Sequence, residues 1–393
     1  MSAQHAIRKR VLILGGYGTF GSRIAEMLAS VPSVQILIAG RDQFKASLLA
    51  NRLQQQFPQT LFVGLRLDLN SINFSAQIRG LNLDVVIHCA GPFQGQDYQV
   101  ARACIDHKVH YLDIADGTDF VTNFGVLHSN ATKAGICAVS GASSLPALSS
   151  AVLAVLTEEF DSISDIDVAI APAHRIHRGL ATVRSGLDAL GSEFNILCEG
   201  RPYRTFAGAE PRKVHLGHPV GTRHVCDFDI PDLKLIPPLW PKLQNLRFGT
   251  GVQPWALQEG LSWCAKFAHV VKQRSTNWHL PWFAKWGHKL AAWWPGGSPH
   301  GGMTIEVRGE IHKRFAKAHW QILGLNGDGP WIPAAPAAAL ARKLLSNDAC
   351  PSHLQGAAPC WQLITLEEIL HELTPYSVIT ATQGPAESSY TSS

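Results

Sequence analysis

The sequence predicts an α/β protein whose first third is a doubly wound parallel sheet. Six short apolar runs recur there at nearly even spacing, with room for one helix and two loops between successive runs. Parallel strands need such crossovers. The runs are apolar throughout, as strands covered on both faces should be. The stretch after the first run has helical periodicity, which completes a strand–helix alternation.

The elements of this region follow in order from residue 11 to residue 139. The expected strands are Val11–Leu14, Val34–Ala39, Leu61–Leu67, Val85–Ala90, Tyr111–Ala115 and Ile136–Val139. After the first strand, Ile24, Met27, Leu28 and Val31 fall at i, i+3, i+4 and i+7, so an amphipathic helix is predicted. Sheets of this kind bind ligands at the carboxyl ends of their strands, where functional residues are therefore expected.

The composition excludes several classes of protein. The 393 residues are 46% hydrophobic and 16% charged, which fits a chain with a large core and excludes a disordered or fibrous one. The net charge of +4 is too small an excess to predict nucleic-acid binding. The longest apolar runs are too short for a transmembrane helix, and the first residues lack the pattern of a signal peptide.

The cysteines indicate a reducing compartment. None of the eight forms a C-x-x-C pair, so a zinc knuckle or a thioredoxin-type site is not expected. A disulfide framework is improbable in so long a chain, and we expect a cytoplasmic protein. The histidines His215, His218 and His224 do not have a metal-ligand spacing with a carboxylate, and no metal site is predicted.

The sharpest motif follows the first strand. The segment from Gly15 to Gly21 contains the pattern G-x-G-x-x-G. The first glycine of this pattern permits a tight turn, the second lets a pyrophosphate approach the backbone, and the third lets the helix pack on the strand. A tight turn without a ligand is the alternative. Because a strand precedes the motif and a helix follows it, we predict a Rossmann-type dinucleotide site formed by Gly16, Tyr17, Gly18, Thr19, Phe20 and Gly21.

The end of the second strand favours NADP over NAD. An NAD site places a carboxylate there to accept from the ribose hydroxyl. This chain has Arg41 instead, and a guanidinium suits a 2′-phosphate. Asp42, one position later, keeps the NAD interpretation open.

Two further strand ends point to the same ligand. Asp68 follows the third strand and could bond the adenine amino group, or it could cap the next helix. The fourth strand ends in Ala90, Gly91 and Pro92, small residues that let the backbone pass close to a cofactor. We include all four in the predicted cofactor site.

Several segments together resemble the saccharopine dehydrogenase-like reductases, in particular their broad bacterial branch. The similar segments are Val85–Tyr98, His110–Gly117, Ser140–Ser149, Arg178–Thr182, Gly301–Met303 and Asp328–Pro333. The resemblance implies an NAD(P)-dependent oxidoreductase that acts on a small molecule and forms a homodimer. It does not identify the acceptor, which could be an imine, a carbonyl or an enoyl compound. A non-catalytic NADP-binding sensor or scaffold is the alternative.

The resemblance also implies a split cofactor domain. Residues 1–145 would form it and residues 331–382 would complete it, around an inserted α+β domain of residues 146–330 for substrate binding and dimerisation. The residues support this division, because Ala334–Leu345 and Leu363–Leu370 read as helices after Pro330. In the inserted domain a helix is expected over Thr182–Leu197. The tail, residues 383–393, is rich in Gly, Ser, Thr and Pro and is expected to be disordered.

Candidate catalytic and substrate-binding residues are less well defined. Tyr98 and Asp113 lie near the fourth and fifth strand ends and could supply a proton, although Asp113 could equally bond the backbone of a turn. Arg175 and Arg178 belong to a basic cluster that could bind a substrate carboxylate, or they could be ordinary surface charges.

A final feature is the segment of residues 263–294. It contains six tryptophans and five basic residues but no Asp or Glu. Trp with basic residues is typical of a helix that lies on anionic lipid. The alternative is that the rings pack in the second domain, cover the cleft or form a dimer contact.

Overall fold

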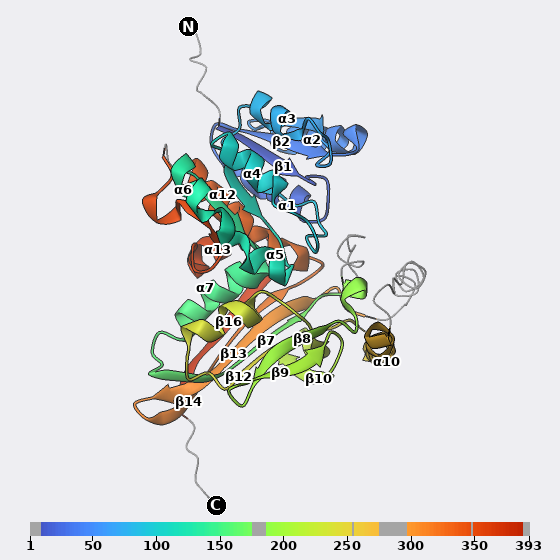
Figure 1. Ribbon diagram of the computed structural model, residues 1–393, viewed down its shortest axis with the longest axis vertical. Helices are drawn as coiled ribbons and strands as arrows, with labels where there is room; N and C mark the ends of the chain where they lie inside the picture. Colours follow the sequence, from blue (N-terminus) through green and yellow to red (C-terminus); the bar gives the residue numbers. More distant parts are fainter. Residues whose placement is uncertain (1–8, 175–185, 254, 275–296, 347–348, 388–393) are drawn as a thin grey trace, which may run out of the picture. The chain divides into compact units, whose positions relative to one another are not determined.

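The computed structural model describes residues 9–174, 186–253, 255–274, 297–346 and 349–387. The chain divides into two compact units, and each has a sheet of its own (Figure 1). Unit 1 contains residues 1–148 and 331–373. Unit 2 contains residues 149–330 and 374–393.

Unit 1 confirms the predicted doubly wound parallel sheet. Its strands are β1 (Lys9–Leu14), β2 (Val34–Gly40), β3 (Leu61–Arg66), β4 (Val85–His88), β5 (His110–Asp113), β6 (Cys137–Ser140) and β15 (Gly356–Pro359). They lie in the order β15-β6-β5-β4-β1-β2-β3, and all neighbours are parallel. Since β1 lies between β2 and β4, the order of the strands reverses beside it. That reversal is where such sheets bind ligands.

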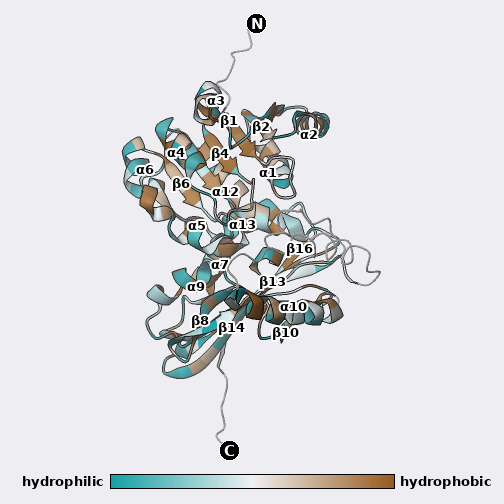
Figure 2. Cartoon of the chain, turned by 45° about the vertical axis from the view of Figure 1, so that its right-hand side comes forward, coloured by the Kyte–Doolittle hydropathy of each residue, from teal (hydrophilic) through white to brown (hydrophobic). Residues whose placement is uncertain are grey.

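The strands of unit 1 are buried on both faces. Val11, Leu12 and Ile13 of β1 have no exposed surface, and the apolar strands appear brown among the helices in Figure 2. The covering helices are α1 (Gly21–Met27), α2 (Gln43–Gln56), α3 (Phe74–Gly80), α4 (Gln99–Asp106), α5 (Thr118–Thr122), α6 (His128–Ala134), α12 (Ala335–Leu345) and α13 (Leu366–Leu373). Short 3-10 turns at Leu28–Ser30, Phe124–Leu127, Gly329–Ala334 and Ser352–Leu354, and a π-type turn at Ser144–Leu148, connect them.

The returning helices of unit 1 are held by polar contacts as well as by packing. Helix α13 begins with a capping box in which Thr365 and Glu368 bond each other's backbone N–H groups. Arg342 of α12 forms two bonds with the buried carboxylate of Glu372 and donates to the carbonyl of Met27, 3.1 Å away, at the end of α1. A buried carboxylate needs such a partner. Arg342 therefore ties the C-terminal helices to the first helix of the unit.

Unit 2 is a mixed sheet with few helices. Its strands are β7 (Ser162–Ala171), β8 (Glu193–Cys198), β9 (Arg201–Phe206), β10 (Arg212–Leu216), β11 (Gly221–Asp227), β12 (Asn245–Thr250), β13 (Gly301–Ile311), β14 (Arg314–Gly324) and β16 (Val378–Glu387). The main path is β10-β11-β12-β7-β13-β14-β16, with β8 paired to β12 and β9 to β8. Among the described strands of unit 2, only the β12–β7 pairing is parallel. Its helices include α7 (Ser149–Leu156), α9 (Asp232–Leu235) and α10 (Trp255–Arg274), with a 3-10 turn at Pro237–Leu239.

A charge cluster joins four strands of this sheet. Asp227 of β11 is fully buried, and both Arg212 and Arg247 bond its carboxylate. Arg212 also bonds Asp167 of β7. Two guanidinium groups offset the cost of burying the carboxylate; they connect β10 and β12 to β11, and Arg212 also connects β10 to β7.

Three expectations for the second half of the chain were wrong within the described residues, which exclude residues 388–393. Residues 193–197 were expected to end a helix, but they lie in β8, whose register with β9 places Ile196 opposite Tyr203. In the described part of that stretch only residues 186–189 are helical. Residues 374–382 were assigned to the first domain and residues 383–393 to a disordered tail. Instead β16 pairs with β14 as far as Glu387, within unit 2. Pairing with β9 stabilises β8, and pairing with β14 stabilises β16. Local composition does not reveal such partners.

Among the described helices, none combines the length and the apolar composition that crossing a bilayer requires.

Unit 2 also buries an acidic group that has an incomplete set of partners. Asp232, the first residue of α9, is 1% exposed. Ser149 of α7 donates to one carboxylate oxygen, and the other oxygen has no partner among the described residues. Burial raises the pKa of Asp232 to about 7, because the charged form would lose its hydration.

This burial predicts a pH-dependent stability. The folded protein binds the Asp232 proton more tightly than the unfolded chain, in which the pKa is about 4. The free energy of unfolding should therefore fall as the pH rises from about 4 through about 7. Asp232→Asn should flatten that fall, since an amide does not ionise. The measurement is urea unfolding at pH 5 and pH 8, with the exposed Asp106→Asn as the control that keeps the wild-type slope. Equal slopes in all three proteins would contradict the assignment.

Candidate functional site

The turn between β1 and α1 depends on close contacts that only glycine permits. A Cβ on Gly21 would lie 2.5 Å from the Gly15 carbonyl oxygen and 2.8 Å from the Gly16 Cα. Gly15 has a φ of +72°, and its Cβ would meet the backbone of Cys89 after β4 at 2.9 Å. The N–H of Gly16 donates to the Ala39 carbonyl of β2 at 3.0 Å. The turn is therefore packed against the ends of both neighbouring strands.

Gly18 differs from the other glycines of this turn. Gly18 is exposed, and a Cβ added to it would meet only the Gly15 carbonyl oxygen, at 3.0 Å. The remaining space at this position is open. In the G-x-G-x-x-G pattern this is the position at which a pyrophosphate approaches the backbone. The half-buried residues Thr19 and Phe20 complete the turn. The Arg23 guanidinium donates to the Thr19 carbonyl and lies 5.2 Å from the centre of the Trp331 ring.

The end of β2 places Arg41 and Asp42 differently. Tyr17 of the glycine turn covers Gly40, where a Cβ would lie 2.5 Å from the ring, and its hydroxyl accepts from the Asp42 N–H at 3.1 Å. The Asp42 carboxylate caps α2 by accepting from the Lys45 N–H at 3.1 Å, and this bond lowers the pKa of Asp42. Arg41 is exposed, and no contact holds its guanidinium among the described residues. The free cation is thus at the strand end, and the carboxylate is used by the helix.

Asp68 and Arg66 lie at the end of β3. The Asp68 carboxylate accepts from the Asn70 N–H at 3.1 Å, so it stabilises a turn; it does not cap α3, whose N-cap residue is Asn73. Arg66 is the last residue of β3, is exposed and pairs in register with Gly40. It adds a second guanidinium beside the end of β2 that we did not identify from sequence, because its place depends on the register.

The loop after β4 contains the predicted residues Ala90, Gly91 and Pro92, and Gln96 fixes its path. The Gln96 amide donates to the carbonyls of Ala90, at 3.0 Å, and of Pro92, at 2.6 Å. Its carbonyl oxygen faces Nε2 of His88, at 3.3 Å. Nδ1 of His88 accepts from the Ala90 N–H at 3.2 Å, so Nε2 carries the proton and donates to Gln96.

His88 is neutral in this arrangement. It is 1% exposed, and burial lowers its pKa to about 4. Two uncharged side chains, those of His88 and Gln96, therefore fix the backbone of the predicted cofactor loop by hydrogen bonds. Sequence reasoning missed both roles, because Gln96 lies in the quoted family segment but bonds the loop only after the chain folds back.

The Asp113 carboxylate bonds the backbone after β5 and β6, as its alternative interpretation expected, and these contacts do not favour a catalytic role. Its side chain is fully buried at the end of β5. It accepts from the hydroxyls of Tyr111 and Ser140, both at 3.0 Å, and from the N–H groups of Ala115, at 2.9 Å, and Gly141, at 2.8 Å. Burial raises the pKa of Asp113 to about 6, and the four donors oppose that rise. The carboxylate therefore links β5 to β6, and both of its oxygens are bonded within the fold.

The Tyr98 hydroxyl is also used within the fold. It donates to the Phe120 carbonyl at 2.9 Å, and its ring packs on those of Phe120 and Phe124. Burial raises its pKa. These contacts make Tyr98 part of an aromatic cluster that supports the loops after β4 and β5, and they do not favour a proton donor.

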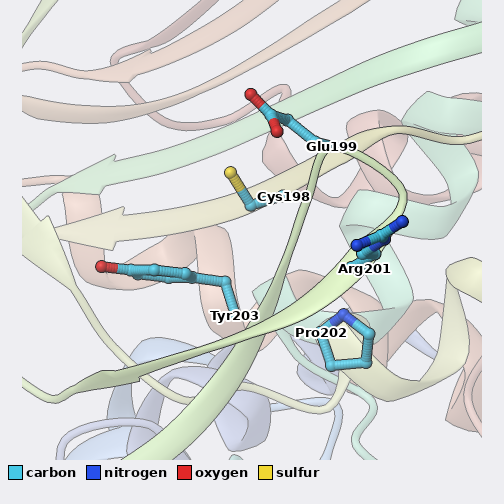
Figure 3. A pocket seen from close by; sticks show the side chains of 5 residues that line it. All are labelled: Cys198, Glu199, Arg201, Pro202 and Tyr203. Carbon is cyan, nitrogen blue, oxygen red and sulfur yellow. The ribbon is translucent and has the colours of Figure 1, made fainter.

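Other predicted features lie outside the described residues or away from the strand ends. Arg175 and Arg178 are outside them, as are the tryptophans from 278 to 294. An open hollow lies on the β8–β9 hairpin, where five side chains point in different directions (Figure 3). One hairpin cannot enclose a ligand, so we do not assign a site there. No group of His, Cys, Asp and Glu side chains in the described part of the chain could hold a metal ion.

The comparisons with known proteins agree with the geometry at the strand ends. The sequence of residues 11–156 matches the family described as "Saccharopine dehydrogenase NADP binding domain". The match confirms the resemblance seen in the sequence, and it supports an NAD(P)-dependent oxidoreductase. No curated protein is similar in sequence at a significant level.

Solved structures resemble the chain only distantly. GenD2 from gentamicin A biosynthesis, in complex with NAD, is 14% identical, with 95% of this chain and 93% of that chain covered and a TM-score of 0.42. Amine dehydrogenase from Mycobacterium smegmatis is 10% identical, with 93% and 97% covered and a TM-score of 0.48. YwfH, an NADPH dependent reductase involved in bacilysin biosynthesis, is 12% identical, with 34% and 70% covered and a TM-score of 0.28. These scores are too low to carry a functional argument.

The glycine turn predicts different outcomes for two substitutions in the NADP binding domain. Gly18→Ala adds a Cβ into open space with one tight contact, so the protein should fold and bind NADPH more weakly, by about tenfold or more. Gly21→Ala forces the added Cβ onto backbone atoms, so it should lower the free energy of unfolding by about 1–3 kcal/mol. Calorimetry and urea unfolding measure the two effects. Unchanged NADPH affinity in Gly18→Ala would show that the turn does not hold the cofactor.

The loop after β4 predicts an effect for a residue that is not expected to touch the cofactor. Gln96→Ala removes the bonds to the Ala90 and Pro92 carbonyls, so the loop should lose its fixed path, and NADPH affinity should fall about tenfold. Gln94→Ala is the matched control, because the exposed Gln94 bonds only Asp116 among the described residues. Calorimetric titration of both variants measures the difference. Equal affinities in the two variants would remove the positioning role of Gln96.

Proposed function

We propose that the protein is an NADP-dependent oxidoreductase that transfers a hydride to or from a small-molecule acceptor. The observation that carries the proposal is the open position at Gly18. It belongs to a turn packed on the ends of β2 and β4, and the loop beside it is locked by His88 and Gln96. A dinucleotide site needs this combination of a bare backbone and fixed neighbours.

The residues of the chain bind and orient, and the cofactor supplies the chemistry. Its nicotinamide ring gives or accepts the hydride. Gly16 to Gly21 would hold the pyrophosphate, and Ala90, Gly91 and Pro92 would present backbone to the middle of the cofactor. Asp68 would lie near the adenine, although its carboxylate is shared with a turn. Since Asp113 and Tyr98 are bonded within the fold, we propose that a proton, where the reaction needs one, comes from water. Arg175 and Arg178 remain our candidates for a substrate carboxylate.

The experiment that tests this proposal is spectroscopic. NADPH oxidation is followed at its near-ultraviolet absorbance with a panel of imines, 2-oxo acids and enoyl esters, with Gly18→Ala as the control of cofactor dependence. Turnover of a panel member by the wild type, lowered in Gly18→Ala, supports an oxidoreductase. Tight NADPH binding without turnover of any member supports the alternative, a non-catalytic sensor or scaffold.

The choice of NADP rests on the end of β2. Arg41 is exposed and unengaged among the described residues, while the Asp42 carboxylate caps α2. The exposed Arg66 on the neighbouring strand adds positive charge. Both guanidinium groups favour a 2′-phosphate, and neither helps to bind a 2′-hydroxyl.

Arg41→Ala should therefore separate the two nucleotides. The loss of a charged hydrogen bond should weaken NADPH binding by roughly 1.5–3 kcal/mol and leave NADH binding almost unchanged. Arg52→Ala removes an exposed guanidinium further along α2 and is the control for net charge. Calorimetric Kd values for NADPH and NADH decide the matter. Equal losses for both nucleotides would remove the 2′-phosphate assignment.

We also propose a peripheral contact with an anionic membrane through the region that begins in α10. Trp255, Trp263 and Phe267 of this helix are each at least 64% exposed, and the Lys266 ammonium lies 5.1 Å from the centre of the Trp263 ring. Exposed Trp with neighbouring basic residues suits the headgroup region. Flotation with anionic vesicles at low and high salt tests it, with Trp263→Ala as the variant. An absence of co-flotation at low salt would contradict the membrane contact, and the rings would then be candidates for contacts with the substrate or with a partner subunit.

Homodimer formation and a cytoplasmic location remain proposals that follow from the family resemblance and the cysteine usage. Light scattering of the purified protein measures the first directly, and a monomer at micromolar concentration would contradict it. Fractionation of cells that express the protein measures the second.

A further inference from the structure

The two sides of the sheet in unit 1 meet different halves of a dinucleotide. The order of the strands reverses beside β1, and in such sheets each side of the reversal binds one mononucleotide of the cofactor. The proposed function assigns the 2′-phosphate to Arg41 at the end of β2, so the adenosine half belongs to the side of β2 and β3. The nicotinamide half then belongs to the carboxyl ends of β4, β5 and β6. The inference below rests on this proposed cofactor site.

The loops after β4 and β5 come together at Asp116. His88, the last residue of β4, pairs in register with Asp113, the last residue of β5. The Ile114 N–H extends that pairing by donating to the His88 carbonyl at 3.3 Å. Asp116 follows two residues later, and its carboxylate accepts from the side-chain amide of Gln94, in the loop after β4, at 3.3 Å. Asp116 therefore lies on the nicotinamide side of the sheet, beside the loop that is predicted to meet the cofactor.

Aromatic contacts fix this position. The Phe93 ring, in the loop after β4, packs on the Phe120 ring of α5, with 5.4 Å between the ring centres. The Tyr98 hydroxyl donates to the Phe120 carbonyl at 2.9 Å. Both contacts join the loop after β4 to the helix that begins two residues after Asp116. The carboxylate is thus held in place by the packing of its neighbours as well as by Gln94.

The Asp116 carboxylate differs from the other acidic groups near these strand ends. Asp113 is buried and accepts from four donors. Asp97 accepts from an N–H at the start of α4, and Asp119 lies in the first turn of α5, where a helix stabilises a negative charge. Asp116 is exposed, and no Arg or Lys among the described residues pairs with it. The neutral amide of Gln94 orients the carboxylate and leaves its charge in full.

We propose that the Asp116 carboxylate stabilises the oxidised form of the cofactor. The reduced nicotinamide ring is neutral, and the oxidised ring carries one positive charge. In the proposed reaction a carbon–hydrogen bond of the ring breaks, and the hydride takes both electrons to the acceptor, which is reduced. A fixed negative charge nearby lowers the free energy of the resulting cation and hardly changes that of the neutral ring. Asp116 therefore favours hydride transfer from the cofactor to the acceptor.

Calorimetric titration of the full-length protein with NADP⁺ and with NADPH at pH 8 tests the proposal. Both nucleotides carry the 2′-phosphate, so the ratio of their Kd values reports the charge of the ring. Asp116→Asn removes the negative charge and keeps an oxygen that can accept from Gln94, and the exposed position should tolerate it. The Kd for NADP⁺ should rise about fivefold or more, and that for NADPH should change by less than about twofold.

Asp106→Asn is the matched control. Asp106 is exposed and ends α4 before β5 begins, so the substitution removes the same charge from the opposite edge of the sheet. Both Kd values should stay at the wild-type level. An unchanged Kd ratio in Asp116→Asn, or an equal loss for the two nucleotides, would overturn the role of Asp116 while the cofactor site stands. A wild type that binds neither nucleotide would overturn the proposed cofactor site, and this inference with it.

Discussion

The close approach of Gly21 to the Gly15 carbonyl is the constraint on which the first unit depends. No room for a Cβ exists between the start of α1 and the end of β1. Since packed interiors do not yield by the width of a methyl group, helix and strand can meet only through glycine. The same turn lies against the backbone of Cys89, so β1 and β4 end in contact. Gly15, Gly16 and Gly21 pack against the strand ends, whereas Gly18 has open space around the position of a Cβ.

Polar side chains near this turn form hydrogen bonds with the backbone and with one another, and these bonds leave them less available to a ligand. His88 and Gln96 bond the loop after β4, and Asp113 collects four donors from β5, β6 and the residues that follow them. A buried polar group is stable only when it is bonded, and these groups satisfy one another and the main chain. The reactive parts of the proposed site are therefore backbone atoms, exposed charged groups and the cofactor itself. This division fits a reaction whose chemistry the nicotinamide supplies.

The second unit buries two carboxylates whose hydrogen-bond partners differ. Asp227 has two guanidinium partners, whereas Asp232 has a single hydroxyl donor among the described residues. Burial therefore affects them unequally. It raises the pKa of both, but the two arginines oppose the rise at Asp227. A paired charge contributes to the register of the sheet, and a poorly paired one makes the stability of the unit depend on pH.

The sequence by itself determined the doubly wound sheet, the glycine turn and the resemblance of residues 11–156 to a saccharopine dehydrogenase NADP binding domain. These features depend on local patterns: apolar runs, helical periodicity and glycines at positions where the backbone has no room for a side chain. Tertiary structure alone decided which polar residues remain available. Asp42 and Asp113 look like ligands in the sequence, yet a helix N-terminus uses the first and two strands use the second. The strand β16 depends on its pairing with β14, a segment distant in sequence, and a pattern of neighbouring residues contains no information about that pairing.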